Sequence, residues 1–421
     1  MDSRPRVAAV ALSLVLLTLF LAPPAGAGKG ESLQVPLNLP AGNALGAYTG
    51  TVRIAVGEVK DETFSENPSH VGMGPQAIYE IVTEGTRAEY VRKGISEALG
   101  QVGLLAASPA DAAYTLDVTL LRDHLQAHQT FGRFRLRTEL FLDFAFKRDG
   151  VREGWVLACG NAQTYAQLAS KAKFVETYQL AFNDAVHKLF NSGTLARIAG
   201  EGWKPAPAPA AAGEHNTTRI AKDEFYGPTD FIQAEAAKAA KAIQGAGPAD
   251  RIWLPDFLLE EVGGKEKDAI SDPAFARAFV PALVREHLNA FYPGAFATID
   301  RGSEPSAKQG VAVNGTLDDF RIGSFAMRVW VGFGAGKDKL AGEVAFKDAA
   351  TGSTLHTTEV SSSNWGAGWQ TKQGTLRDMA DQLARDLAYF LVRTAAPGYK
   401  PPEGLEILFD DTAYPMKQRK S

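Results

Sequence analysis

The sequence predicts an α+β fold made by tandem duplication of one β-α-β-β-β-α module. Several runs alternate apolar and polar residues, as strands with one buried face do, and other runs repeat apolar residues at helical spacing. The same order of runs occurs twice, with matching runs about 200 positions apart. We therefore expect two mostly antiparallel sheets, each with two helices on one face.

The first copy follows from six runs. "YTLDVTLL" and "LRTELFLDFAF" alternate strictly, and Asp149-Gly150 is a hairpin signal. "YVRKGISEALGQVGLL" places Val91, Ile95 and Leu99 on one helical face. The expected elements are a strand at 51–59, a helix at 90–105, strands at 114–121, 136–146 and 155–165, and a helix at 176–190.

The second copy repeats this order. "FARAFVPALVREHLNAFYPG" carries apolar residues and His287 at helical spacing, and "TLRDMADQLARDLAYFLVRTA" has the strongest helical pattern in the chain. The expected elements are a strand at 251–259, a helix at 275–294, strands at 311–319, 339–348 and 354–363, and a helix at 375–395.

Composition marks the boundaries between these parts. "EGWKPAPAPAAAGEHNTT" is rich in Pro and Ala, which is typical of an extended, semi-rigid linker. The alanine-rich run "DFIQAEAAKAAKAIQGAG" after it predicts a short helix. The predicted division is a signal peptide at 1–27, a first module at 47–200, a linker with a short helix at 201–248, a second module at 249–396, and an extended, irregular tail at 397–421.

The first residues indicate export. Arg4 and Arg6 precede an apolar run at 7–22, and Ala25 and Ala27 are small residues that a signal peptidase accepts. The apolar run is short for a membrane span, so we expect a cleaved signal, with an uncleaved anchor as the alternative. We expect a periplasmic or secreted protein with no membrane span after cleavage.

Cysteine content and charge narrow the class further. The only cysteine is Cys159, so no internal disulfide forms, and no cysteine follows the signal to carry a lipid. The chain is therefore not expected to be a lipoprotein. A net charge of -4 gives no overall electrostatic support for a nucleic-acid partner.

The segment "RVWVGFGAGKDKL", from Arg328 to Leu340, raises the question of a phosphate-binding loop. Such a loop reads G-x-x-x-x-G-K-[ST] and opens a helix. Here Val331 stands where the first glycine belongs, and Asp338 follows Lys337 where Ser or Thr would stand. The next residues alternate as a strand does. We therefore expect a turn between two strands, and no nucleotide or other cofactor.

This segment, together with "VAFKDAATGSTL" and the long terminal helix, resembles a group of bacterial envelope proteins. Their C-terminal domain of unknown function carries a G-F-G-x-G hairpin and a D-x-x-T-G turn. The resemblance covers 251–396, and Lys337 departs from the small residue that often follows the third glycine. More distantly, the arrangement is similar to the N-terminal domain of the Tol–Pal translocation protein and to the periplasmic part of the curli secretion channel. The resemblance implies an accessory or scaffolding role without catalysis, and it transfers no catalytic residue.

Few other residues suggest chemistry. His124 and His128 have the spacing of a metal-binding pair on a helix, but they follow a strand. A solvated loop is the favoured interpretation, a metal site is the alternative, and no metal is expected. Cys159 shares a strand face with Trp155 and Leu157, which favours a buried small side chain over a reactive thiol.

Four carboxylates lie close together in the second copy: Asp318, Asp319, Glu343 and Asp348. Aspartate is common in turns, where it bonds the local backbone, so we interpret these as turn or surface groups. A catalytic acid–base pair is the alternative.

The second copy also provides candidate partner contacts, because aromatic residues are enriched where proteins bind one another. The candidates are Trp330, Phe333, Lys337, Trp365 and Trp369. Whether the aromatic residues form an interface or pack internally stays open.

The predicted function is that of a non-catalytic, exported accessory or scaffold protein that binds another protein during cell-envelope assembly or secretion. The alternative is a periplasmic protein that binds a small apolar or glycan ligand. A hydrolytic enzyme is a third hypothesis.

Overall fold

The computed structural model describes most of the chain. The described residues are 31–41, 44–64, 69–73, 77–83, 85–130, 133–166, 170–206, 229–245, 249–259, 273–302, 310–321, 338–364 and 372–409. The predicted signal peptide and most of the Pro/Ala-rich linker lie outside them.

The first module forms one sheet in the order β16-β8-β7-β6-β3. Here β3 runs parallel to β6, and β6, β7 and β8 form an antiparallel meander. Helices α2 and α3 pack on one face, which confirms the predicted β-α-β-β-β-α order. Their bounds are β3 (Ile54–Asp61), α2 (Arg87–Val102), β6 (Tyr114–Thr130), β7 (Arg133–Arg148), β8 (Val151–Ala166), α3 (Lys171–Phe190), α4 (Gly193–Ala199) and β16 (Leu405–Leu408).

Local sequence signals set the ends of α2. Thr86 and Glu89 form a reciprocal capping box at its start, which satisfies backbone N–H groups that have no helical partner. At its end Gly103 adopts a left-handed conformation with φ 82°, which a residue without Cβ does at little cost.

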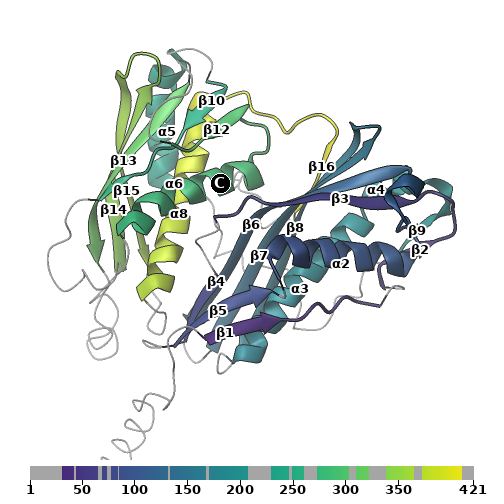
Figure 1. The fold of residues 1–421 in the computed structure, drawn as a ribbon. Helices are drawn as coiled ribbons and strands as arrows, with labels where there is room; N and C mark the ends of the chain where they lie inside the picture. Colours follow the sequence, from purple (N-terminus) through teal and green to yellow (C-terminus); the bar gives the residue numbers. More distant parts are fainter. Residues whose placement is uncertain are drawn as a thin grey trace, which may run out of the picture.

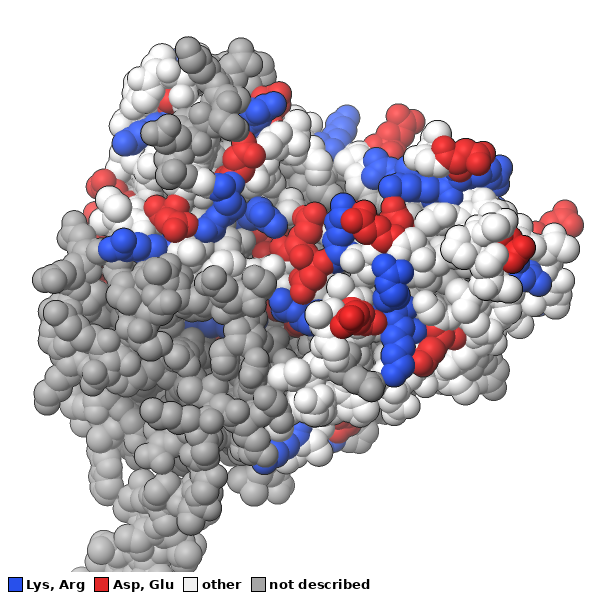
Figure 2. Space-filling view, viewed as in Figure 1, with Lys and Arg blue, Asp and Glu red and all other residues white. Residues whose placement is uncertain are grey.

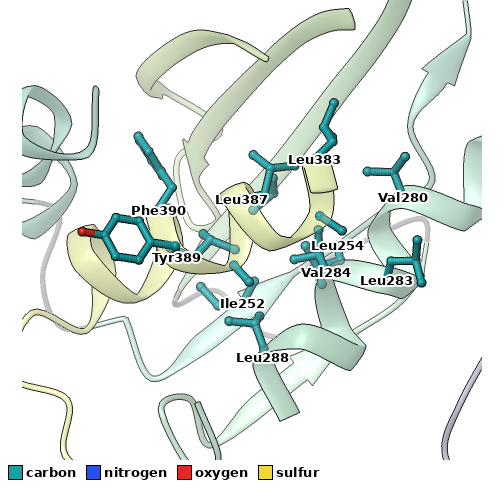
Figure 3. Packing of buried hydrophobic residues seen from close by; sticks show 14 of the residues in the cluster. Ile252, Leu254, Val280, Leu283, Val284, Leu288, Leu383, Leu387, Tyr389 and Phe390 are labelled. Atoms are coloured by element: carbon teal, nitrogen blue, oxygen red, sulfur yellow. The ribbon is translucent and has the colours of Figure 1, made fainter. Parts of the chain in front are cut away.

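The second module repeats the plan in a sheet ordered β12-β10-β13-β14-β15, with β11 beside β13. Helix α8 lies between α5 and α6 in the helix layer, and Figure 3 shows apolar residues of α6 and α8 packed together. Their bounds are α5 (Asp230–Gly245), β10 (Arg251–Trp253), β11 (Leu258–Leu259), α6 (Pro273–Phe291), β12 (Thr298–Asp300), β13 (Val311–Arg321), β14 (Asp338–Asp348), β15 (Thr354–Asn364) and α8 (Lys372–Ala395).

Strand pairing matches between the two sheets. Asp143 lies opposite Leu157 in the first sheet, and Glu343 lies opposite Glu359 in the second. The parallel pair Ile54–Tyr114 corresponds in the same way to the β10–β13 pairing. The predicted duplication is therefore present in the register of the strands as well as in their order.

Three parts extend beyond the predicted plan. The polar insertion before α2 forms a hairpin that joins an N-terminal strand in a small sheet, β1-β5-β4. A second pair, β2 and β9, lies beside α2 and α4. Helix α5, expected within the linker, packs in the core of the second module. The tail, expected to be irregular, contributes β16 to the first sheet. The bounds are β1 (Glu31–Val35), β2 (Gly46–Tyr48), β4 (Ser69–Met73), β5 (Ala77–Thr83) and β9 (Trp203–Pro205).

The two modules stack in four layers, visible from left to right in Figure 1. The second sheet comes first, then α6 and α8, then the first sheet, and finally α2 and α3. The helices of the second module thus cover its own sheet on one side and the outer face of the first sheet on the other. We use outer face for the side of each sheet opposite its own helices.

A buried charged junction as candidate functional site

The predicted partner-contact residues cannot be placed. Trp330, Phe333, Lys337, Trp365 and Trp369 lie outside the described residues, as do the glycines of the loop. The chain is described again from Asp338, where β14 begins and pairs antiparallel with β13. A strand therefore follows Lys337, as predicted, and not the helix that a phosphate-binding loop would open.

The prediction of a solvated loop at His124 is wrong. Strand β6 continues through both His124 and His128, and His124 is buried. The register shifts between Leu120 and Arg122, and this irregularity interrupts the strict alternation from which the end of the strand was predicted. The side chain of His128 lies outside the described residues.

Arg122 stands at the centre of a charged cluster between the modules. Its side chain is 0% exposed, and its Nη1 atom lies 2.8 Å from Oδ1 of Asp381 on α8. The Nη2 atom of Arg122 lies 3.4 Å from Oε2 of Glu139 on β7, and its Nη1 atom lies 3.8 Å from Oε2 of Glu286 on α6. Arg137 forms a second contact with Glu139. One buried cation therefore joins acids of both modules.

Asp381 also accepts hydrogen bonds from two further side chains of the cluster. It accepts from Nε2 of His287 at 2.9 Å and from Arg385, one turn further along α8, at 3.3 Å. Burial alone would raise the pKa of Asp381, but attraction by Arg122, His124 and His287 brings it well below its usual value. The carboxylate is therefore ionised over the whole neutral range.

Two neighbouring side chains on α6 have pKa values shifted by the same burial. Burial raises the pKa of Glu286 to about 7, against the attraction of Arg122 and a 2.6 Å hydrogen bond from the backbone N–H of Phe64. Burial lowers the pKa of His287 to about 4, although Asp381 opposes this. His287 is therefore neutral near pH 7, while Glu286 is close to half-protonated.

A second set of polar bonds surrounds Asp123 of β6. Its backbone oxygen accepts from Arg377 of α8 at 3.2 Å, and its carboxylate accepts from the Tyr178 hydroxyl at 3.0 Å. Arg87 of α2 lies 3.6 Å from the same carboxylate. Arg377, Asp381 and Arg385 are four residues apart, so they form one stripe along α8 that faces the first module.

The junction also has an apolar part, to which Cys159 belongs. The Phe141 ring lies 4.7 Å from that of Phe291 on α6 and 5.1 Å from that of Phe409 in the tail. Leu157 and Cys159 of β8 join the same core. Cys159 is 1% exposed, which confirms the prediction of a buried small side chain.

The structure separates the four carboxylates of the second copy. Asp319 forms an ion pair with Lys339 at 2.8 Å, and Asp348 accepts hydrogen bonds from backbone N–H groups two and three positions ahead, as turn aspartates do. Asp318 and Glu343 are exposed. The interpretation as turn and surface groups is confirmed for Asp348 and agrees with the exposure of the other two.

A polar cleft of about 490 Å³ opens beside the charged cluster. It is lined by Asp61, Glu62, Thr63, Arg285, Asn289, Phe296, Ala297, Thr298 and Ile299. Arg285 donates to the backbone oxygen of Glu62 at 3.3 Å and so links the two modules at the wall of the cleft. In Figure 2, acidic and basic side chains gather over the junction of the modules.

The histidine–aspartate pair has the geometry of a general base with its orienting carboxylate. The side chains that line the cleft, however, are different ones, and Asp381 is already bonded to two arginines. Within the described part of the chain, no group of three or more His, Cys, Asp or Glu is arranged to hold a metal ion. The charged cluster thus joins the two modules.

Sequence reasoning placed His287 on the core face of its helix, and the structure confirms this. It missed the rest of the cluster, because charged residues at helical spacing ordinarily mark the solvent face. The available signal was the uninterrupted periodicity of α8 on two faces: an apolar face, and the stripe of Arg377, Asp381 and Arg385.

Comparisons with known proteins gave one family match and several similar solved structures. Residues 252–368 match the model of a domain of unknown function, DUF4410. Among curated proteins, none matches the chain. Solved structures similar to it include a PelC dodecamer from Paraburkholderia phytofirmans, with 11% identity over 33% of this chain and 87% of that chain, at a TM-score of 0.23. A Xanthomonas campestris protein of the DUF330 family has 9% identity over 40% of this chain and 97% of that chain, at a TM-score of 0.29.

No helix among the described residues is long and apolar enough to cross a membrane.

Proposed function

We propose that this protein is a non-catalytic, exported scaffold that binds another protein of the cell envelope. In this role the two modules act as one rigid body, and the outer surface of the second module receives the partner.

The observation that supports this proposal is the buried ion pair between Arg122 and Asp381, with the cluster around it. This cluster of buried ionisable groups draws its members from both modules, and its ion pairs connect one module to the other. Removing one partner of a buried ion pair leaves the other charge uncompensated, at a cost of about 3–5 kcal/mol, so the cluster favours the one relative orientation of the modules in which these charges are paired. A fixed orientation is what a scaffold needs.

The N-terminal sequence supports the proposed location outside the cytoplasm. Arg4, Arg6 and the apolar run at 7–22 have the form of a secretory signal. The match of residues 252–368 to a domain of unknown function accords with the predicted resemblance to envelope proteins, and it assigns no catalytic residue.

The test is capture of the partner in cells. The full chain, tagged at its C-terminus, is expressed with its own leader, and intact cells are crosslinked before fractionation and purification. We expect the protein outside the cytoplasm and one envelope protein crosslinked to it in constant ratio. Recovery from the cytoplasm, or absence of any specific envelope partner with two crosslinkers of different chemistry, would contradict the proposal.

The polar cleft supports a second candidate, a small hydrophilic ligand such as a glycan. Its walls provide carboxylates from Asp61 and Glu62, an amide from Asn289 and a guanidinium from Arg285, and these groups suit hydroxyl-rich ligands better than apolar ones. Native mass spectrometry of the purified chain distinguishes this candidate, because a bound ligand would add a constant mass. Asn289→Ala should remove that mass without lowering the melting temperature.

A further inference from the structure

The last strand of the meander has different neighbours in the two modules. In the first module, β16 pairs parallel with β8, from Leu405 opposite Trp155 to Leu408 opposite Ala158. The Glu406 carboxylate of β16 accepts from the backbone N–H groups of Gly193 and Thr194 at 2.9 and 2.8 Å, at the start of α4. The edge of the first sheet is therefore closed by an extended segment from a distant part of the chain.

In the second module, β15 occupies the place of β8, since Glu359 corresponds to Leu157 by strand register. Within the described residues β15 pairs with β14 alone and ends its sheet. It is 11 residues long. A long edge strand offers unpaired backbone groups that an extended peptide can pair with.

The helix layer already extends toward this edge. Helix α5 packs beside α8 and against β15, and Glu235 of α5 lies 3.5 Å from His356 of β15. A strand added beside β15 would therefore lie over a helix, as β16 lies near α4 in the first module.

Charge on the outer face indicates what kind of strand would fit. Glu343 and Glu359 lie directly opposite each other, both are exposed, and neither forms an ion pair with another described residue. Like charges in this position destabilise a sheet, so a cation beside Glu359 would relieve the repulsion. In the first module the residue of β16 opposite the corresponding position, Leu157, is Ile407.

The same charges disfavour a second copy of this chain. Glu359 is the middle residue of β15, so antiparallel pairing of two copies in full register would place the two Glu359 side chains opposite each other. With Glu343 of each copy, four carboxylates would then form one row across the joined sheet. A partner with the opposite charge fits better.

We infer that the free edge of β15 is a docking site for an extended segment of a partner protein, added parallel to β15 and carrying Lys or Arg opposite Glu359. The inference rests on the proposed scaffold function and names the chemistry of its partner.

The test uses the full chain and a peptide with the sequence of residues 401–409, made with Lys or with Glu in place of Ile407. Binding of each labelled peptide is measured by fluorescence anisotropy, and hydrogen exchange locates the protected amides. We expect the Lys peptide to bind about 2- to 5-fold more tightly than the Glu peptide and to protect residues 354–364. Glu359→Lys should reverse the order of affinities, while Glu97→Lys, the same change on an exposed face of α2, should leave it unchanged.

Equal affinities of the two peptides, an unchanged order in Glu359→Lys, or protection of β8 in place of β15 would overturn the inference. So would a concentration-dependent dimer of the chain that protects 354–364 without peptide, because a second copy would then occupy the edge. An envelope partner captured equally well by Glu359→Lys would remove the docking site and leave the scaffold function standing. Peptide binding at β15 without capture of any envelope partner would leave the docking site standing and remove the scaffold function.

Discussion

The two modules share their strand register, but the outer faces of their sheets differ. In the first sheet Phe141, Leu157 and Cys159 are apolar and covered by the second module. In the second sheet the corresponding face carries exposed Glu343 and Glu359. Duplication thus fixes the sheet and its helices, while a few outward-facing residues decide which copy is covered. Among the described residues, the outer face of the second sheet is the exposed one, and it is there that we propose a partner binds.

The comparison also explains why the charged cluster lies where it does. Helix α8 is buried on two sides, against its own sheet through Leu383 and Leu387 and against the first sheet through Arg377 and Asp381. Its counterpart α3 packs on its own sheet and on β1, and its Lys173 forms an ion pair with the partly exposed Glu176. Charged residues at helical spacing therefore mark a buried contact with the other module on α8, but only a partly exposed ion pair on α3.

The largest expected effect comes from removing the central cation. Arg122→Met leaves Asp381, Glu139 and Glu286 buried without their shared partner, so we expect the free energy of unfolding to fall by about 3–5 kcal/mol. Urea denaturation measures this free energy. The matched control is Arg92→Met at an exposed position, which we expect to lower the free energy of unfolding by less than about 0.5 kcal/mol. A loss below about 1 kcal/mol in Arg122→Met would mean that the cluster does not hold the modules together.

Removing the strand that closes the first sheet should have a somewhat smaller effect. A chain that ends at Glu403 lacks β16 and Phe409, and with them four partly buried apolar side chains: Leu405, Ile407, Leu408 and Phe409. Half-burial of four such side chains corresponds to a loss on the order of 3 kcal/mol. Denaturation of the shortened chain measures this loss. Hydrogen exchange should then show newly exposed amides in β8 and no change in β15, and equal exposure of both would contradict the difference between the two edges.

Adjacent residues of α6 predict opposite pH dependence. Folding raises the pKa of Glu286 from 4.5 to about 7, so the stability it contributes is lost as the pH rises through that window. Folding lowers the pKa of His287 from 6.5 to about 4, so the stability it contributes is lost as the pH falls through that window. Between pH 4.5 and 6.5 the two contributions therefore oppose each other.

Glu286→Gln removes one of the two. Compared with the parent chain, we expect this variant to lose on the order of 2 kcal/mol more stability on acidification from pH 6.5 to 4.5. Urea midpoints across this range measure the difference, and exposed Glu97→Gln serves as control. Parallel pH curves for Glu286→Gln and the parent would show that Glu286 is ionised throughout.

The sequence was sufficient to predict the elements that depend on one periodicity. Alternation gave β6, β7 and β14, and helical spacing gave α2, α3 and α8, because each of these has one apolar face that packs into the core of its own module. The four-layer stack was out of reach, since contacts between distant segments leave no local period. His124 is an example. Past the irregularity near Arg122, polar residues of β6 face the other module, so the sequence pattern resembles that of a loop although the strand continues.

The tail could not be assigned for a related reason. "LEIL" is too short to carry a strand pattern, and its partner β8 lies about 250 positions earlier in the chain. The proposed docking site at β15 became apparent only from the register of both sheets, because Glu359 looks like an ordinary exposed residue until Ile407 is found opposite its counterpart.

The smallest expected effect concerns Glu406, which separates the closed edge from the open one. Its carboxylate accepts from two backbone N–H groups at the start of α4, a charge-assisted contact worth about 1 kcal/mol. Glu406→Gln keeps the shape and loses the charge, so we expect a loss of about 0.5–1 kcal/mol, with exposed Glu403→Gln as the matched control near zero. Because β16 is held by its backbone pairing as well, the strand should stay in place, and amide exchange in β8 should rise only slightly. A loss as large as that of the shortened chain would mean that the cap, and not the pairing, holds the tail, and a peptide without such a cap would then be too weak a ligand for β15.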